Sequence, residues 1–199
     1  MTTALLFSMA AFSFAASISS GPVNIVAMSA GMRYGFVRSV WFVTGATIGF
    51  VVLLVFVGLG LSAAISWLPN LLAVVRWAGV LLLIYMAVGL ATDGGAMSPG
   101  RTATAPSAMD GALLQWLNPE AWLASIAGMG VFSVGADVDR LLTFATIYFI
   151  VCYLSIGCWA IAGTFLRRWV ADPSKIRVMN RLLAALLTAS AAYLAFAGV

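Results

Sequence analysis

The stretch Val51-Val52-Leu53-Leu54-Val55-Phe56-Val57 is continuously apolar and decides the fold class. A strand that crosses a membrane as part of a barrel alternates apolar and polar residues. No such alternation occurs in this stretch, which therefore predicts a helix.

The chain as a whole is also strongly apolar. Of its 199 residues, 63% are hydrophobic and 8% are charged, whereas soluble domains contain about 25% charged residues. Lipid offers no hydrogen-bond partners, so a spanning segment must satisfy its backbone internally, as a helix does. We expect an all-α integral membrane protein without a sizeable soluble domain.

A helix needs about 20 residues to cross a bilayer, and the chain has room for six such spans. No basic segment precedes the first apolar stretch, which also continues well past any cleavage-like site, so we expect it to be a mature helix rather than a signal peptide. The predicted spans are at about 4–30, 40–62, 70–91, 112–134, 141–165 and 179–198.

Basic residues gather on one side of these spans. Eight of the ten fall there, and the other side has two, Arg76 and Arg140. Because basic loops stay in the cytoplasm, we expect both termini outside. The eight are Arg33, Arg38, Arg101, Arg167, Arg168, Lys175, Arg177 and Arg181.

The chain contains a weak internal repeat. Residues 21–32 and 118–129, aligned without gaps, share a proline, two alanines, a glycine and a methionine. A linker at 92–111, rich in Gly, Ser, Thr, Pro and Ala, separates the halves 1–91 and 112–199. With three spans in each half, the second must run inverted, which is typical of secondary transporters.

Two prolines inside predicted spans mark the candidate site. Pro22 and Pro119 each remove a backbone hydrogen bond, and such breaks are tolerated at membrane depth where protein or a cavity surrounds them. A plain proline kink is the alternative. Asn24 and Asn118 lie beside the breaks. Their amides can satisfy the freed backbone, join helices or bind a substrate.

Glu120 is the one acidic residue within a predicted span. Ionisable groups inside a membrane are costly and indicate function, so Glu120 could bind an ammonium group or take up a proton. The alternative is a position near the interface, paired with an arginine. Gly45 and Gly49 form a G-x-x-x-G pattern, which favours close helix packing.

The chain resembles the LysE/RhtB family of bacterial amino-acid exporters. The resemblance rests on four segments, which are Ser20–Asn24, residues 31–49 with Gly-Met-Arg-Tyr-Gly-Phe and Gly45-Ala-Thr-Ile-Gly49, Leu117–Trp122, and Asn180-Arg181-Leu182. It implies a six-span inner-membrane exporter of amino acids or related metabolites, driven by proton antiport. The site positions that it implies are Gly21, Pro22, Asn24, Asn118, Pro119 and Glu120.

The chain departs from the family pattern at three positions. Ser20 replaces a proline, Glu120 replaces a lysine, and Phe50 stands where an acidic residue often follows the glycine. The loss of that acidic residue disfavours a dedicated lysine exporter. Glu120 could restore the negative charge at another position, and neutral amino acids fit the pattern as well.

Other functions fit the residues less well. A metal-ion exporter would need His, Cys or clustered carboxylates, and the chain has no histidine. A thiol–disulfide carrier would need cysteines on facing helices, but Cys152 and Cys158 share one predicted helix. A non-transporting scaffold stays open. We expect no enzyme activity, no cofactor, no metal and no nucleic-acid partner. Membrane lipid is the expected surrounding, and the glycine pattern allows a homodimer.

Overall fold

The computed structural model describes residues 1–19, 21–60, 68–92, 105–132, 137–169 and 173–196. This part of the chain is helical and contains no strand, which confirms the all-α prediction. Its helices are α1 (Thr3–Ile18), α2 (Pro22–Tyr34), α3 (Phe36–Gly60), α4 (Leu68–Ala91), α5 (Ala108–Trp116), α6 (Pro119–Val131), α7 (Val138–Trp169) and α8 (Pro173–Phe196).

Local sequence signals set several helix ends. Ser107 and Asp110 form a reciprocal capping box that starts α5, because each side chain satisfies a backbone N–H of the other residue. Helix α5 therefore begins at Ala108, inside the linker predicted for 92–111. Gly35 joins α2 to α3 with φ of 81°, a left-handed conformation that glycine adopts without strain.

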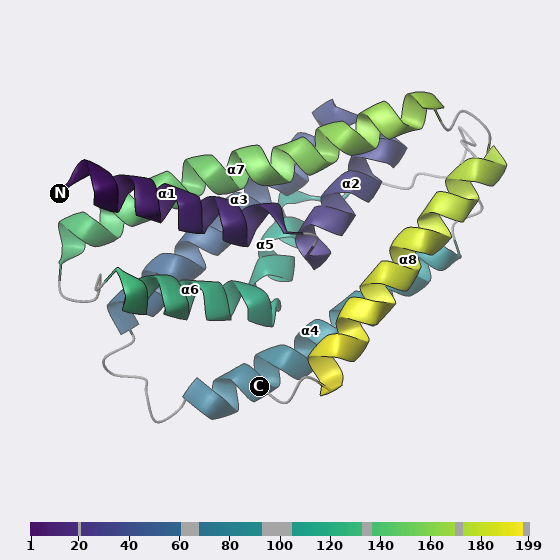
Figure 1. Cartoon of the computed structure of the whole chain (residues 1–199). Helices are drawn as coiled ribbons and strands as arrows, with labels where there is room; N and C mark the ends of the chain where they lie inside the picture. Colours follow the sequence, from purple (N-terminus) through teal and green to yellow (C-terminus); the bar gives the residue numbers. More distant parts are fainter. Residues whose placement is uncertain (20, 61–67, 93–104, 133–136, 170–172, 197–199) are drawn as a thin grey trace.

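The helices pack around α3 and α7. Helix α7 contacts α1, α2 and α3, while α3 also contacts α5 and α6. Helices α4 and α8 pack against each other and form a pair beside the rest, as Figure 1 shows. The long α7 runs alongside α1 over most of the length of α1 (Figure 1).

Glycines allow two of these helix pairs to approach closely. A Cβ atom at Gly45 would collide with the carbonyl oxygen of Ala108, and one at Gly49 would lie 2.7 Å from Cα of Ala112, so both glycines lie at the α3–α5 contact. At the α2–α7 contact, a Cβ atom at Gly163 would collide with the carbonyl oxygen of Met28. Small residues bring helix backbones together in the same way in membrane proteins generally.

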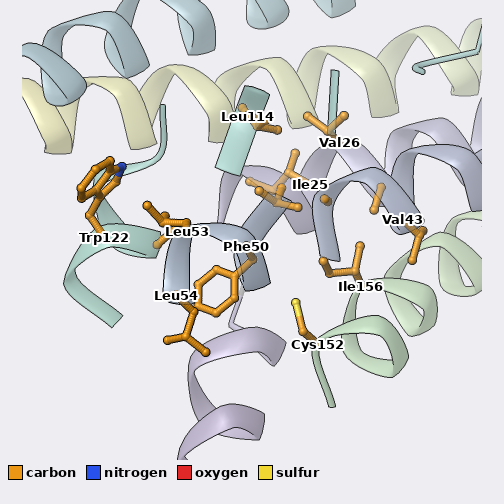
Figure 2. Packing of buried hydrophobic residues seen from close by; sticks show 14 of the residues in the cluster. Ile25, Val26, Val43, Phe50, Leu53, Leu54, Leu114, Trp122, Cys152 and Ile156 are labelled. Carbon is orange, nitrogen blue, oxygen red and sulfur yellow. The ribbon is translucent and has the colours of Figure 1, made fainter. Parts of the chain in front are cut away.

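Apolar side chains fill the space between the helices and also cover the outside. Figure 2 shows Phe50, Leu53 and Leu54 of α3 between Trp122 of α6 and Cys152 of α7. On the outer surface of α4, in contrast, Leu81 is 68% exposed. An apolar exterior suits a helix that faces lipid, where the solvent is as apolar as the core.

Within the described ranges, three helical segments are long and apolar enough to cross a membrane, at Phe36–Gly60, Ala73–Ala91 and Val138–Arg167. Helices α1 and α2 supply a fourth if the pair, bent by 64°, is one span. The full set of six spans and its division at 92–111 stay predictions, and most of that linker, 93–104, lies outside the described residues.

Candidate functional site

The first helix break lies at Pro22. Helix α1 ends at Ile18, and Pro22 occupies the first turn of α2, where its missing N–H costs no hydrogen bond. The amide nitrogen of Asn24 donates to the carbonyl oxygens of Ser17 at 2.7 Å and Ser19 at 2.6 Å. Asn24 thus satisfies the carbonyl group of Ser17, which the interrupted helix leaves without a partner, and adds a second donor to that of Ser19, which also accepts the backbone N–H of Gly21.

A tryptophan from another helix supports the same break. Trp159 of α7 donates its indole N–H to the carbonyl oxygen of Ile18 at 3.1 Å. Three consecutive carbonyl groups at the end of α1, those of residues 17–19, therefore accept side-chain donors. The sequence indicates the role of Asn24 through its neighbour Pro22, but nothing in it pairs Trp159 with this break.

The second break lies at Pro119. Helix α5 ends at Trp116, and Asn118 caps α6 by accepting the backbone N–H of Glu120 on Oδ1 at 3.1 Å. The indole N–H of Trp122 donates to the carbonyl oxygen of Trp116 at 2.8 Å. At both breaks, side-chain donors thus bond to carbonyl groups at the end of the preceding helix.

One cavity of about 60 Å³ borders both breaks. Four of the six predicted site residues line it, namely Gly21, Asn24, Asn118 and Glu120. Pro22 and Pro119 are buried beside the cavity without lining it, because each is the first residue of a helix that leads away from the break. Gly45 and Gly49 are also outside its lining, at the α3–α5 contact.

Several residues that line the cavity are not among the predicted site residues. Ser17 precedes the first break, Gln115 precedes the second, and Phe50, Tyr148 and Cys152 form walls. Phe50 stacks on Tyr148 with ring centroids 4.3 Å apart. Apart from Gln115, which lies in the short α5, these residues belong to long apolar helices, in which a sequence pattern does not reveal the inward face.

Glu120 at the second break lies against Gly21 at the first break. A Cβ atom on Gly21 would lie 2.9 Å from Oε2 of Glu120, so the carboxylate occupies space that any other residue at position 21 would fill. Within the described part of the chain, no ion pair involves Glu120. The carboxylate lies in the first turn of α6, where the helix dipole favours a negative charge.

The cavity offers hydrogen-bond acceptors without nearby basic groups in its lining. Oδ1 of Asn24, a residue only 4% exposed, has no hydrogen-bond partner among the described residues. Together with Glu120 it could accept the ammonium group of an amino acid. Helix α2 has no side-chain cap at its N-terminus, and such an end favours a carboxylate group.

The described residues give no support to a metal site. No group of three His, Cys, Asp or Glu side chains that could hold a metal ion occurs among them. Both cysteines are free, with Cys152 buried and Cys158 exposed.

We expect Asn24→Ala to destabilise the protein strongly. The carbonyl group of Ser17 would lose its donor, whereas that of Ser19 would keep the backbone N–H of Gly21, so we expect a cost of about 1–3 kcal/mol. Thermal unfolding in detergent measures the loss. Asn180→Ala is the matched control, because neither side-chain polar atom of the buried Asn180 has a partner in the described residues, and we expect its effect to stay below about 1 kcal/mol. Equal losses in both variants would contradict the role of Asn24.

The chain is similar to known proteins over most of its length. The family model "LysE type translocator" matches residues 14–198. The cysteine/O-acetylserine efflux proteins of Salmonella choleraesuis and Salmonella typhimurium are each 26% identical over 190 residues, covering 94% of this chain and 95% of theirs. The protein of the same name from Escherichia coli is 25% identical over the same length. No solved structure matches the chain significantly.

Proposed function

Since the chain belongs to the LysE type translocator family, we propose that it exports small neutral amino acids through the cavity between its two helix breaks. The observation on which the proposal depends is the meeting of Glu120 and Asn24 at one cavity. Relatives with the name cysteine/O-acetylserine efflux protein support substrates of this size and charge.

The substrate would lie with its ammonium group at Glu120 and Oδ1 of Asn24. Its carboxylate would then point to the N-terminal end of α2, whose dipole favours negative charge. This orientation uses groups from both halves of the chain. It also gives the uncapped end of α2 a function.

Glu120 also supports proton antiport. A proton and an ammonium group exclude each other at one carboxylate, because protonation removes the charge that attracts the ammonium. Release of the substrate outside would let Glu120 take up a proton, which it would lose to the cytoplasm before binding the next substrate. Exchange of this kind needs no further ionisable group in the cavity.

The packing of the helices supports an arrangement as two inverted repeats. Helices α1 and α2 pack on α7, just as α5 and α6 pack on α3, and α4 packs on α8. Under this arrangement the six spans are α1–α2, α3, α4, α5–α6, α7 and α8, in the cytoplasmic membrane. The basic residues of the α2–α3 region would lie in the cytoplasm and both termini outside.

Transport into inverted membrane vesicles tests the function. We expect radiolabelled cysteine and O-acetylserine to accumulate when the vesicle interior is acidic, since that gradient drives proton exit and substrate entry. Lysine should accumulate at least about tenfold less. Among the described residues that line the cavity, Glu120 is the one acidic residue, so no second carboxylate is present to bind the ammonium group of the lysine side chain. Vesicles without the protein are the control.

Two outcomes would contradict the proposal. Absence of transport for every amino acid would favour a scaffold, and gradient-driven uptake of a divalent cation instead would favour a metal-ion exporter. Accumulation of cysteine that is unaffected when the pH gradient is collapsed would retain the exporter and overturn proton antiport.

A further inference from the structure

A cluster of three polar side chains lines the cavity beyond the groups that would bind the ends of an amino acid. Helix α1 contributes Ser17 to this cluster, and helix α7 contributes Tyr148 and Cys152. Tyr148 and Cys152 are four residues apart and therefore share one face of α7. Ser17 lies next to both the phenol and the thiol.

The hydroxyl group of Ser17 is buried, and it makes no hydrogen bond to any of the described residues. Buried polar groups are normally paired, and an unpaired one is a net cost to folding. Neighbouring serines behave differently. Ser13, one turn earlier on α1, donates to the carbonyl oxygen of Met9 at 2.7 Å, so the two buried serines of α1 differ although they lie on the same helix.

Aromatic packing holds Tyr148 in place. Its ring stacks on Phe50 with centroids 4.3 Å apart and meets Phe144 edge to face at 5.7 Å. Figure 2 shows Phe50 and Cys152 projecting into the same part of the core. A ring fixed on two sides keeps its hydroxyl group in one position, as a selective binding group requires.

We propose that Ser17, Tyr148 and Cys152 form a subsite for the side chain of the substrate, which selects a short polar group such as a thiol, a hydroxyl or an ester carbonyl. The inference rests on the proposed export function. The subsite lies beside Asn24, whose amide nitrogen bonds the carbonyl of Ser17 itself. Asn24 and Ser17 would thus contact the ammonium group and the side chain of the substrate from neighbouring positions at the first break.

A pair of substrates of matched shape tests the subsite. Cysteine and 2-aminobutyrate differ only in a thiol in place of a methyl group, so the ratio of their kcat/KM values reports the polar contact alone. We expect the wild-type protein to prefer cysteine, because a site with unpaired polar groups rejects the apolar analogue. Ser17→Ala should lower this ratio about tenfold, and Tyr148→Phe should lower it in the same direction.

Ser13→Ala is the matched control, since it removes a hydroxyl from the same helix outside the cavity lining, and we expect it to leave the ratio unchanged. A variant that folds poorly lowers both rates together and so does not change the ratio. If the wild-type protein exports cysteine but both Ser17→Ala and Tyr148→Phe keep its ratio, the subsite is wrong while the exporter stands. If no amino acid is transported, the proposed function itself fails.

Discussion

Replacing Glu120 by glutamine should abolish transport while the protein still folds. The substitution keeps the shape but removes the charge that would bind the ammonium group, and loss of a charged hydrogen bond of about 3 kcal/mol lowers transport roughly 100-fold. Folding should survive because Glu120 caps its helix through its backbone N–H, which donates to Oδ1 of Asn118, and glutamine retains that N–H.

Two assays on Glu120→Gln separate its roles. Uptake driven by an acidic vesicle interior needs both substrate binding and proton exchange, whereas exchange of labelled for unlabelled substrate needs binding alone. We expect both to be lost, since one carboxylate serves both steps. Asp139→Asn is the control, because this acid lies in the first turn of α7 and not in the cavity lining.

Glu120→Asp should retain part of the activity, because it preserves the carboxylate on a shorter side chain. A wild-type rate with an unchanged pH dependence in Glu120→Gln would remove Glu120 from the mechanism. Retained substrate exchange with lost gradient-driven uptake would restrict Glu120 to the proton and exclude it from ammonium binding.

Gly163→Ala should destabilise the protein by about 3 kcal/mol, at the upper end of what overpacking costs. Its Cβ atom would collide with the carbonyl oxygen of Met28, and backbone cannot rotate away as a flexible side chain can. Helices α2 and α7 would have to separate, which would also displace the start of α2 at the first break. Thermal unfolding in detergent measures the change.

Gly157→Ala is the matched control on the same helix. A Cβ atom there meets nothing within 4 Å, and alanine favours a helix over glycine by up to about 1 kcal/mol. We therefore expect Gly157→Ala to be neutral or stabilising. A Gly163→Ala protein as stable as the Gly157→Ala protein would show that the α2–α7 contact is looser than the structure has it.

The sequence predicts the helix breaks well because their cause is local. Proline lacks an N–H, so Pro22 and Pro119 start new helices wherever the chain around them lies. The positions next to them follow for the same reason, and Asn24 and Asn118 both bond backbone at their breaks. Linker residues that form a capping box, Ser107 and Asp110, escaped the prediction although their signal is local too.

The subsite residues could not be predicted in this way. In a soluble protein, apolar residues that recur every three or four positions show which face of a helix is buried. Both faces of a membrane helix are apolar, so nothing in α1 or α7 distinguishes the cavity side from the lipid side. Ser17 and Ser13 are indistinguishable in sequence, yet only Ser17 lines the cavity.

The sequence by itself determined that the chain is helical, suited to a membrane and broken at two prolines, because composition and the missing proline N–H act without reference to the rest of the fold. Only the tertiary structure decided that Glu120 lies against Gly21 and that Trp159 supports the end of α1. Those contacts join residues far apart in the chain. They depend on how closely glycine-lined helices pack, which is a property of pairs of helices and not of any one segment.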